Sequence, residues 1–440
     1  MARPQTTPRP APRTRRPGRG LAHRIARRRS QTIRAGSSVT LFAVLGPGLL
    51  AGLSDDDPAG ITTYSLLGAD YGYRLLWVLA LSTVALVVFH ELGARMGVVT
   101  GQGLLALVRT RFGRRAATYG AAILTIANVG TMCAELAGIA AGAELLFHIG
   151  KGVSVPIAAA IIALLVLRGS FKRVEHVLLA VSAVFVTYIA SGVLAHPDWL
   201  AAGKGLVLPS MPLTRDAVYL AVATVGTTLA PWGIAFIQSY AVDKQIPRSQ
   251  LGLERVDVIT GAALTGVIGV FIVMACAATL HARGIPIVEA ADAARGLEPL
   301  AGPLAGTLFG VGIVGAGFLA GAIVPMSTAY SVCEGLDRPA DVNASLREAP
   351  FFYGTFVAVV VVSAAIVLVP GLPLIGILVA TQALNAVLVL FMLPFLITLA
   401  RDRDLMGDDA LAGPALLAAL TAFAFVALAI VALGYLAIAS

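Results

Sequence analysis

Eleven apolar runs, each long enough to cross a lipid bilayer, constrain the fold of this 440-residue chain more than any other feature. Inside a bilayer the backbone finds no water, so a spanning segment must satisfy its own amides, as an α-helix does. With 58% hydrophobic and 13% charged residues, the composition excludes an ordinary soluble domain. We therefore expect an all-α integral membrane protein with eleven transmembrane helices. Their expected ranges are 39–70 (broken), 73–94, 117–147, 153–168, 174–195, 215–242 (broken), 256–281, 303–331, 351–369, 373–400 and 412–437.

The first run is interrupted near its middle by residues 54–60, with the sequence SDDDPAG. A charged residue at the bilayer centre costs at least about 2.5–3.5 kcal/mol, and proline removes a backbone donor. Both penalties become tolerable where the helix is broken and its loose backbone lines a polar cavity inside the protein. Acidic side chains beside unwound carbonyls indicate a cation site, with Asp57 as a ligand and Ser54, Asp55 and Asp56 near it.

The sixth run has a second interruption at residues 227–233, TTLAPWG. Pro58 and Pro231 each open a block of five spans, and because five is odd the two blocks enter the membrane from opposite sides. Paired interrupted helices at corresponding positions are typical of inverted-repeat transporters, whose substrate site lies at the repeat interface. We expect a first repeat at 39–200, a second at 215–400, and a loop with the eleventh span at 401–440.

Basic residues predict the topology. The tail, residues 1–38, carries eleven arginines and no acid, and we expect it to be disordered and cytoplasmic. With the N-terminus inside, the tail and the loops on its side hold 26 of the 32 Lys and Arg residues, so the C-terminus is expected outside. The charge excess therefore reports topology in a cytoplasmic membrane, and no nucleic-acid partner is expected.

These residues carry a family resemblance. From Val39 to Gly407 the chain resembles the Nramp divalent-metal transporters, in LGPGLLAG leading to DPAG, GYRLLWVLA, ARMGVVTG, Glu135 of the third span, FKRVEHV and LPFLITLARDRDLMGD. The resemblance implies a LeuT-type fold with two inverted five-helix repeats and broken helices 1 and 6. In that family the two breaks read DPGN and MPH, and Asp, Asn and Met side chains grip a transition metal.

At the metal positions this chain departs from the family. Asp57 is kept, but the asparagine position is Gly60 and the methionine position is Ala230. The departures resemble the Nramp-related magnesium transporter branch. A thioether favours soft or borderline ions, whereas Mg²⁺ prefers oxygen and is held by one or two carboxylates through retained waters. The sequence thus predicts a wider, all-oxygen site for Mg²⁺ that also admits Mn²⁺.

The family's titratable positions also differ. The two sixth-span histidine positions are Trp232 and Ile237, and the third-span aspartate position is Met132. Because none of these side chains titrates near neutrality, we expect transport without obligatory proton coupling. Glu135 could serve either a rudimentary proton path or structure, and Trp232 could block, pack or gate the cavity.

Other side chains complete the expected site. Thr227 lies one turn before Ala230 and offers a hydroxyl, and the resemblance places Gln382 at the site, with Asn385 close by. His90 and Glu91 fall toward the cytoplasmic end of the second span, where an interfacial ion pair is the expected role.

The expected function is uptake of Mg²⁺, and also Mn²⁺, by a potential-driven carrier. The alternatives are a proton-coupled Mn²⁺/Fe²⁺ symporter of the ordinary Nramp type and, behind it, an organic-solute transporter of the same fold. We expect no catalytic residue and no cofactor, because the metal ion is substrate. The expected partners are that ion and the lipid bilayer, with the protein acting as a monomer.

Overall fold

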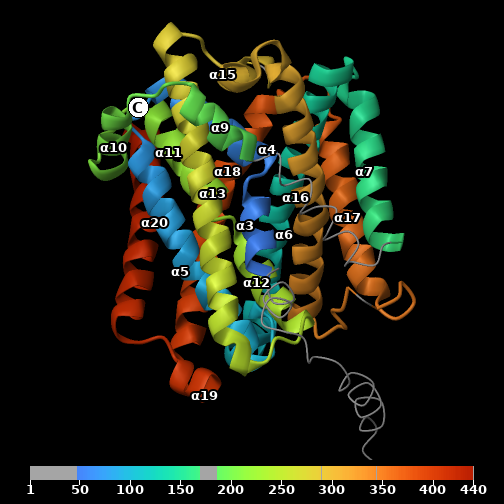
Figure 1. Ribbon diagram of the computed structural model, residues 1–440. Helices are drawn as coiled ribbons and strands as arrows, with labels where there is room; N and C mark the ends of the chain where they lie inside the picture. Colours follow the sequence, from blue (N-terminus) through green and yellow to red (C-terminus); the bar gives the residue numbers. More distant parts are fainter. Residues whose placement is uncertain (1–46, 169–185, 289, 343, 440) are drawn as a thin grey trace, which may run out of the picture. The chain divides into compact units, whose positions relative to one another are not determined.

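A computed structural model describes residues 47–168, 186–288, 290–342 and 344–439 (Figure 1). The described residues form α-helices joined by short 3-10 turns and loops, with no strand among them. The basic tail expected at 1–38 and most of the fifth span expected at 174–195 lie outside the described residues. The all-α class is therefore confirmed for the described chain.

The helices match the expected spans. Eight described segments are long and apolar enough to cross a membrane, and the shorter helix α7, the broken pair α3–α4 and helix α9 correspond to the other three spans. The long helices are α5 (Leu76–Thr100), α6 (Leu104–Phe147), α7 (Lys151–Arg168), α13 (Leu251–Thr279), α16 (Ala305–Gly335), α17 (Pro350–Val367), α18 (Leu374–Arg401) and α20 (Gly413–Ala439). The short elements are α9 (Val186–Leu194), α10 (Trp199–Val207), η2 (Arg248–Gln250), η3 (His281–Arg283), α14 (Ala290–Ala294), η4 (Arg295–Leu297), α15 (Glu298–Ala301), η5 (Gly302–Leu304), α19 (Arg403–Met406) and η6 (Gly407–Asp409).

Both predicted helix breaks are present. The first span divides into α3 (Pro47–Asp55) and α4 (Pro58–Tyr71), and the sixth into α11 (Arg215–Thr228) and α12 (Pro231–Asp243). Each proline is the first residue of the second half-helix, where its missing N–H leaves no bond unmade and its fixed φ suits the helix. The residues before the prolines, Asp57 and Ala230, have extended backbones.

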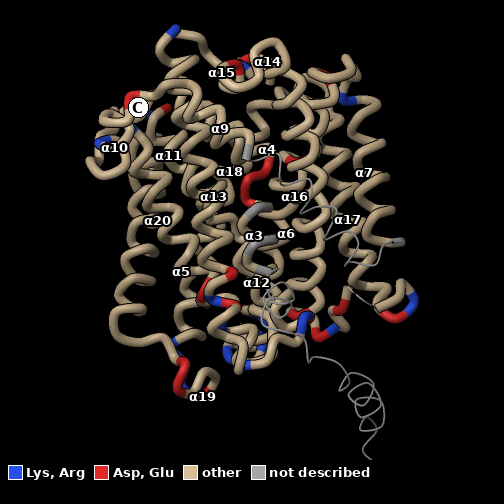
Figure 2. Tube along the Cα trace, viewed as in Figure 1, with Lys and Arg blue, Asp and Glu red and all other residues tan. Residues whose placement is uncertain are grey.

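The two broken helices run antiparallel. Helix α4 packs against α11, and α3 packs against α12. A contact between the Tyr64 hydroxyl and Thr228 Oγ1, 3.0 Å apart, joins α4 to the end of α11. Helices α13 and α16 contact the first broken helix, and the acidic segment between α3 and α4 lies midway along the surrounding helices (Figures 1 and 2).

Close packing at the first break depends on a glycine of α6. A side-chain carbon built on Gly138 would overlap the ring of Pro58, so only a residue without a side chain lets α6 lie this close. Helix α6 also starts earlier than the expected 117–147, because residues 104–112 form further helical turns before a kink at Gly113. Gly113 takes a φ of 87°, which L side chains rarely adopt.

Candidate metal site at the crossing of the broken helices

Asp57 has a structural role as well as a predicted ligand role. It is the N-cap of α4, and its Oδ1 accepts a hydrogen bond of 2.5 Å from the backbone N–H of Gly60. Aspartate is a preferred N-cap because a helix begins with unpaired amide donors. The side chain is only 3% exposed, so its second carboxylate oxygen faces the protein interior.

Gly60, Asp57 and Thr227 converge at one point between the two breaks. A side-chain carbon built on Gly60 would lie 2.9 Å from the Asp55 carbonyl oxygen and 3.3 Å from both Asp57 Oδ1 and Thr227 Oγ1. Glycine at position 60 therefore lets a carbonyl, a carboxylate and a hydroxyl oxygen lie close together, because a side-chain carbon would not fit among them. Thr227 is buried and its hydroxyl has no hydrogen-bond partner among the described residues.

The neighbouring acids are buried as well. Ser54, Asp55 and Asp56 are all shielded from solvent at the end of α3. The carboxylate oxygens of Asp55 and Asp56 have no hydrogen-bond partner among the described residues. Within that part of the chain no three His, Cys, Asp or Glu side chains come together to hold a metal ion. The three consecutive acids thus do not form one cage, and a cation at Asp57 would depend on neutral oxygens and water for its other ligands.

The second break presents backbone rather than side-chain polar groups at Ala230. Ala230 is the N-cap of α12 and brings no polar side chain to the crossing. Trp232 is fully buried, and its carbonyl accepts a hydrogen bond of 2.8 Å from Ser327 Oγ of α16. Ser327 thereby fixes the first turn of α12, a contact with no signal in the sequence.

Glu135 lies on α6 one turn before Gly138, which packs on Pro58. The carboxyl group of Glu135 is fully buried and lies beside that of Asp57. The two acids therefore face the same part of the interior from different helices.

Gln382 and Asn385 belong to a polar network on α18. Asn385 Nδ2 donates to Gln382 Oε1 at 3.0 Å and to Thr131 Oγ1 of α6 at 2.9 Å. The backbone of Gln382 contacts Gly226 of α11, which places this network against the sixth span just before its break. The predicted role of Gln382 as a metal ligand therefore requires its side-chain amide oxygen to contact both Asn385 and the ion.

His90 differs from the expectation of an interfacial ion pair. Glu91 does form ion pairs, with Arg95 at 2.8 Å and with Arg255 of α13 at 2.7 Å. His90 is buried instead, and neither of its ring nitrogens has a hydrogen-bond partner among the described residues. Position in the sequence alone could not reveal this, because which face of α5 is buried depends on the packing of α12 and α13 against it.

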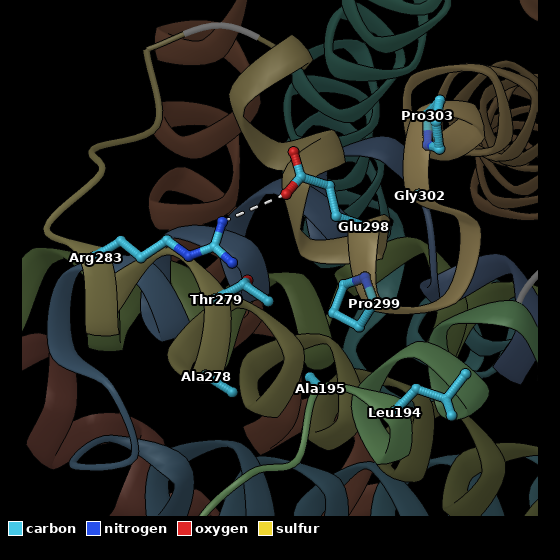
Figure 3. Close-up of a pocket in the computed structure, with 9 residues that line it drawn as sticks. All are labelled: Leu194, Ala195, Ala278, Thr279, Arg283, Glu298, Pro299, Gly302 and Pro303. Carbon is cyan, nitrogen blue, oxygen red and sulfur yellow. Dashed lines mark ion pairs between the residues drawn. The ribbon is translucent and has the colours of Figure 1, made fainter.

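A surface pocket lies away from these residues (Figure 3). It has a volume of about 570 Å³ and is bordered by α13, α15 and the residues that follow α9. An ion pair of 3.5 Å between Arg283 and Glu298 crosses it (Figure 3). None of the residues at the helix breaks lines this pocket, so it is separate from the candidate metal site.

Comparison with known proteins agrees with the sequence resemblance. The family described as natural resistance-associated macrophage protein-like, Nramp, matches residues 48–436. The divalent metal cation transporter MntH of Burkholderia ambifaria is 30% identical over 394 residues, which are 87% of this chain and 86% of that protein.

Solved structures share the fold. A manganese transporter of Eremococcus coleocola, in complex with an aromatic bis-isothiourea substituted compound, matches with a TM-score of 0.75 and 19% identity, over 91% of this chain and 87% of that one. Mhp1, a nucleobase-cation-symport-1 family transporter, matches with a TM-score of 0.55 and 16% identity, over 89% and 93% of the two chains. The expected LeuT-type fold is thereby confirmed. Since the family match spans most of the chain, this protein is a member of the Nramp family of membrane transporters and not an enzyme.

Proposed function

We propose that this divalent metal cation transporter carries Mg²⁺, and Mn²⁺ as a second substrate, by alternating access and without coupling to protons. The observation that supports the proposal is the set of oxygens that meet at Gly60: the Asp55 carbonyl, the Asp57 carboxylate and the Thr227 hydroxyl. Mg²⁺ takes oxygen ligands and gives up water reluctantly, so one carboxylate, a hydroxyl, backbone carbonyls and retained waters suit it.

The second break supports the same preference. Ala230 offers a carbonyl where the family places a thioether, so a soft ion gains no sulfur ligand there. The ion would bind Asp57 and Thr227 directly, with Gly60 and Ala230 setting the width of the site. In this proposal Ser54 and Gln382 contribute further oxygens, and Asp55, Asp56, Glu135, Trp232 and Asn385 lie around them.

Packing at the family's titratable positions supports an uncoupled mechanism. Ile237 lies against Gly93 of α5, and Met132 lies against Gly321 of α16, so both positions are filled by apolar contacts. A membrane potential supplies about 2.3 kcal/mol per charge per 100 mV, or roughly 4.6 kcal/mol for a dication. Inward movement of Mg²⁺ therefore needs no second ion.

The charge asymmetry supports an orientation with a cytoplasmic N-terminus and an extracytoplasmic C-terminus in the cytoplasmic membrane. The α3–α12 half of the crossing then faces the cytoplasm, and the α4–α11 half faces outward. We further propose that the protein acts as a monomer, in which each chain carries a complete site.

A proton-coupled Mn²⁺ symporter is the second candidate. Two observations favour it: Glu135 lies buried beside Asp57, and the Eremococcus coleocola structure is that of a manganese transporter. The two candidates differ in what accompanies the metal, which a vesicle experiment can measure.

The test is uptake into liposomes that contain the purified full-length chain and a Mg²⁺ indicator. A potassium gradient with valinomycin sets an inside-negative potential, and protein-free liposomes report the leak. We expect Mg²⁺ and Mn²⁺ to enter and alanine, tested as a radiolabelled solute, to stay outside. Absence of Mg²⁺ uptake together with rapid Mn²⁺ uptake would refute the proposed substrate, and alanine uptake would favour the organic-solute alternative.

A further inference from the structure

A second set of unpaired polar groups lies beside the breaks, between α3, α5 and α12. A side-chain carbon built on Gly233, in the first turn of α12, would lie 3.0 Å from His90 Nε2 and 3.5 Å from Asp55 Oδ1. An imidazole and a carboxylate from different helices therefore approach the same point, which only a residue without a side chain leaves free.

Both groups are sealed from solvent and unpaired. Asp55 and His90 are each 1% exposed, and in the described parts of the chain neither carboxylate oxygen of Asp55 nor ring nitrogen of His90 has a hydrogen-bond partner. A buried polar group without a partner costs about 1–3 kcal/mol, and a charged one costs more. A bound ion or water is the usual explanation for such a group in a native structure.

The nearest charged residues do not satisfy His90. Its chain neighbour Glu91 is held by two arginines, Arg95 and Arg255. No direct hydrogen bond joins Asp55 to His90, as it would in a purely structural pair. Their arrangement around an open space matches two ligands that approach one ion from different helices.

We propose that Asp55 and His90 bind a second divalent cation, on the α3–α12 side of the central site. Imidazole nitrogen is a ligand for transition-metal ions, whereas Mg²⁺ prefers oxygen, so the second site selects transition-metal ions over Mg²⁺. Water and backbone carbonyls complete the coordination. This inference rests on the proposed function in one respect, the route of the ion. An ion that leaves Asp57 toward the cytoplasm would pass between Asp55 and His90.

The experiment measures Mn²⁺ bound to the purified full-length chain in detergent. Electron spin echo envelope modulation detects a ¹⁴N nucleus coordinated to Mn²⁺ and so reports imidazole ligation directly. We expect the nitrogen signal in the parent chain and also in Asp57→Asn, where the central ligand is weakened. His90→Gln should abolish the signal and weaken Mn²⁺ binding at this site by about tenfold or more, since even outer-shell changes cost 10–100-fold.

His281→Gln is the matched control, because the His281 ring bonds the carbonyl of Ala69 at the opposite end of α4. That variant should keep the signal. Gly233→Ala, which fills the space with a methyl group, should remove the signal with His90 still present, and it replaces His90→Gln if that variant fails to fold. No nitrogen signal in the parent, or an unchanged signal in His90→Gln or in Gly233→Ala, would overturn the inference. If the nitrogen signal is present but Mg²⁺ uptake is absent, the proposed function fails and the second site stands. If Mg²⁺ uptake is present but the nitrogen signal is absent, the second site fails and the proposed function stands.

Discussion

Replacing Asp57 by asparagine separates the two roles that this side chain has in the structure. Asparagine keeps an oxygen that can accept the 2.5 Å hydrogen bond from Gly60 N–H, but it carries no charge for a cation. Alanine removes both the cap and the charge. The pair Asp57→Asn and Asp57→Ala therefore distinguishes a ligand from a helix cap.

The magnitudes follow from the two roles. Loss of an N-cap costs about 0.5–2 kcal/mol of stability on substitution by alanine, whereas asparagine caps as well as aspartate. Loss of a metal ligand should weaken binding at least as much as the 10–100-fold that outer-shell changes cost. We thus expect both variants to lose about 100-fold or more in Mg²⁺ uptake at low Mg²⁺, while only Asp57→Ala is less stable than the parent.

The assays are Mg²⁺ uptake in liposomes and thermal unfolding in detergent, performed on the same preparations. Uptake by Asp57→Asn within a few-fold of the parent would refute the ligand role and leave Asp57 as a cap alone. Equal loss of stability in both variants would refute the capping argument, because asparagine should preserve the bond to Gly60.

Three further predictions concern selectivity, coupling and packing. Ala230→Met, alone and with Gly60→Asn, should improve Cd²⁺ binding and weaken Mg²⁺ binding, as measured by calorimetry, because it restores a thioether; unchanged affinities for both ions would place selectivity elsewhere. Glu135→Gln should retain potential-driven Mg²⁺ uptake in liposomes, and loss of uptake in a folded variant would show that this acid is needed. Gly138→Ala should cost about 1–3 kcal/mol of stability by thermal unfolding, because its methyl overlaps the first-break proline. Gly130→Ala on the same helix has ordinary contacts and should unfold like the parent, and equal effects of the two would refute the packing argument.

Much of the fold could be predicted from the sequence because the bilayer leaves few choices. The length of an apolar run determines where a helix can cross the bilayer. Pro58 and Pro231 determine where the second half of each broken helix begins. The antiparallel crossing of the two breaks followed from the odd number of spans, five, in each repeat. Helix α6 was longer than expected, since residues 104–112 form helical turns, buried in their first half, that hydropathy alone assigned to a loop.

The site was less accessible to sequence reasoning. The acids of residues 55–57 could be placed at the break, but the sequence could not show whether they gather as metal ligands, and among the described residues no three acidic, His or Cys side chains do. His90 was expected in an interfacial ion pair because it lies toward the cytoplasmic end of the second span, yet only Glu91 reaches arginines. Side-chain direction depends on which helices pack around each residue, and a single sequence does not report those contacts.

The central claim is that Mg²⁺ crosses alone, driven by the membrane potential. Its most direct test is the potential at which net Mg²⁺ flux through the liposome-reconstituted protein reverses. With tenfold more Mg²⁺ inside than outside, an uncoupled dication should reverse at about 30 mV, inside negative, since a tenfold ratio corresponds to 29.6 mV for two charges. We expect that value to stay the same when a pH gradient is imposed across the membrane. A reversal potential that moves with the pH gradient would contradict the account and show that protons travel with the metal.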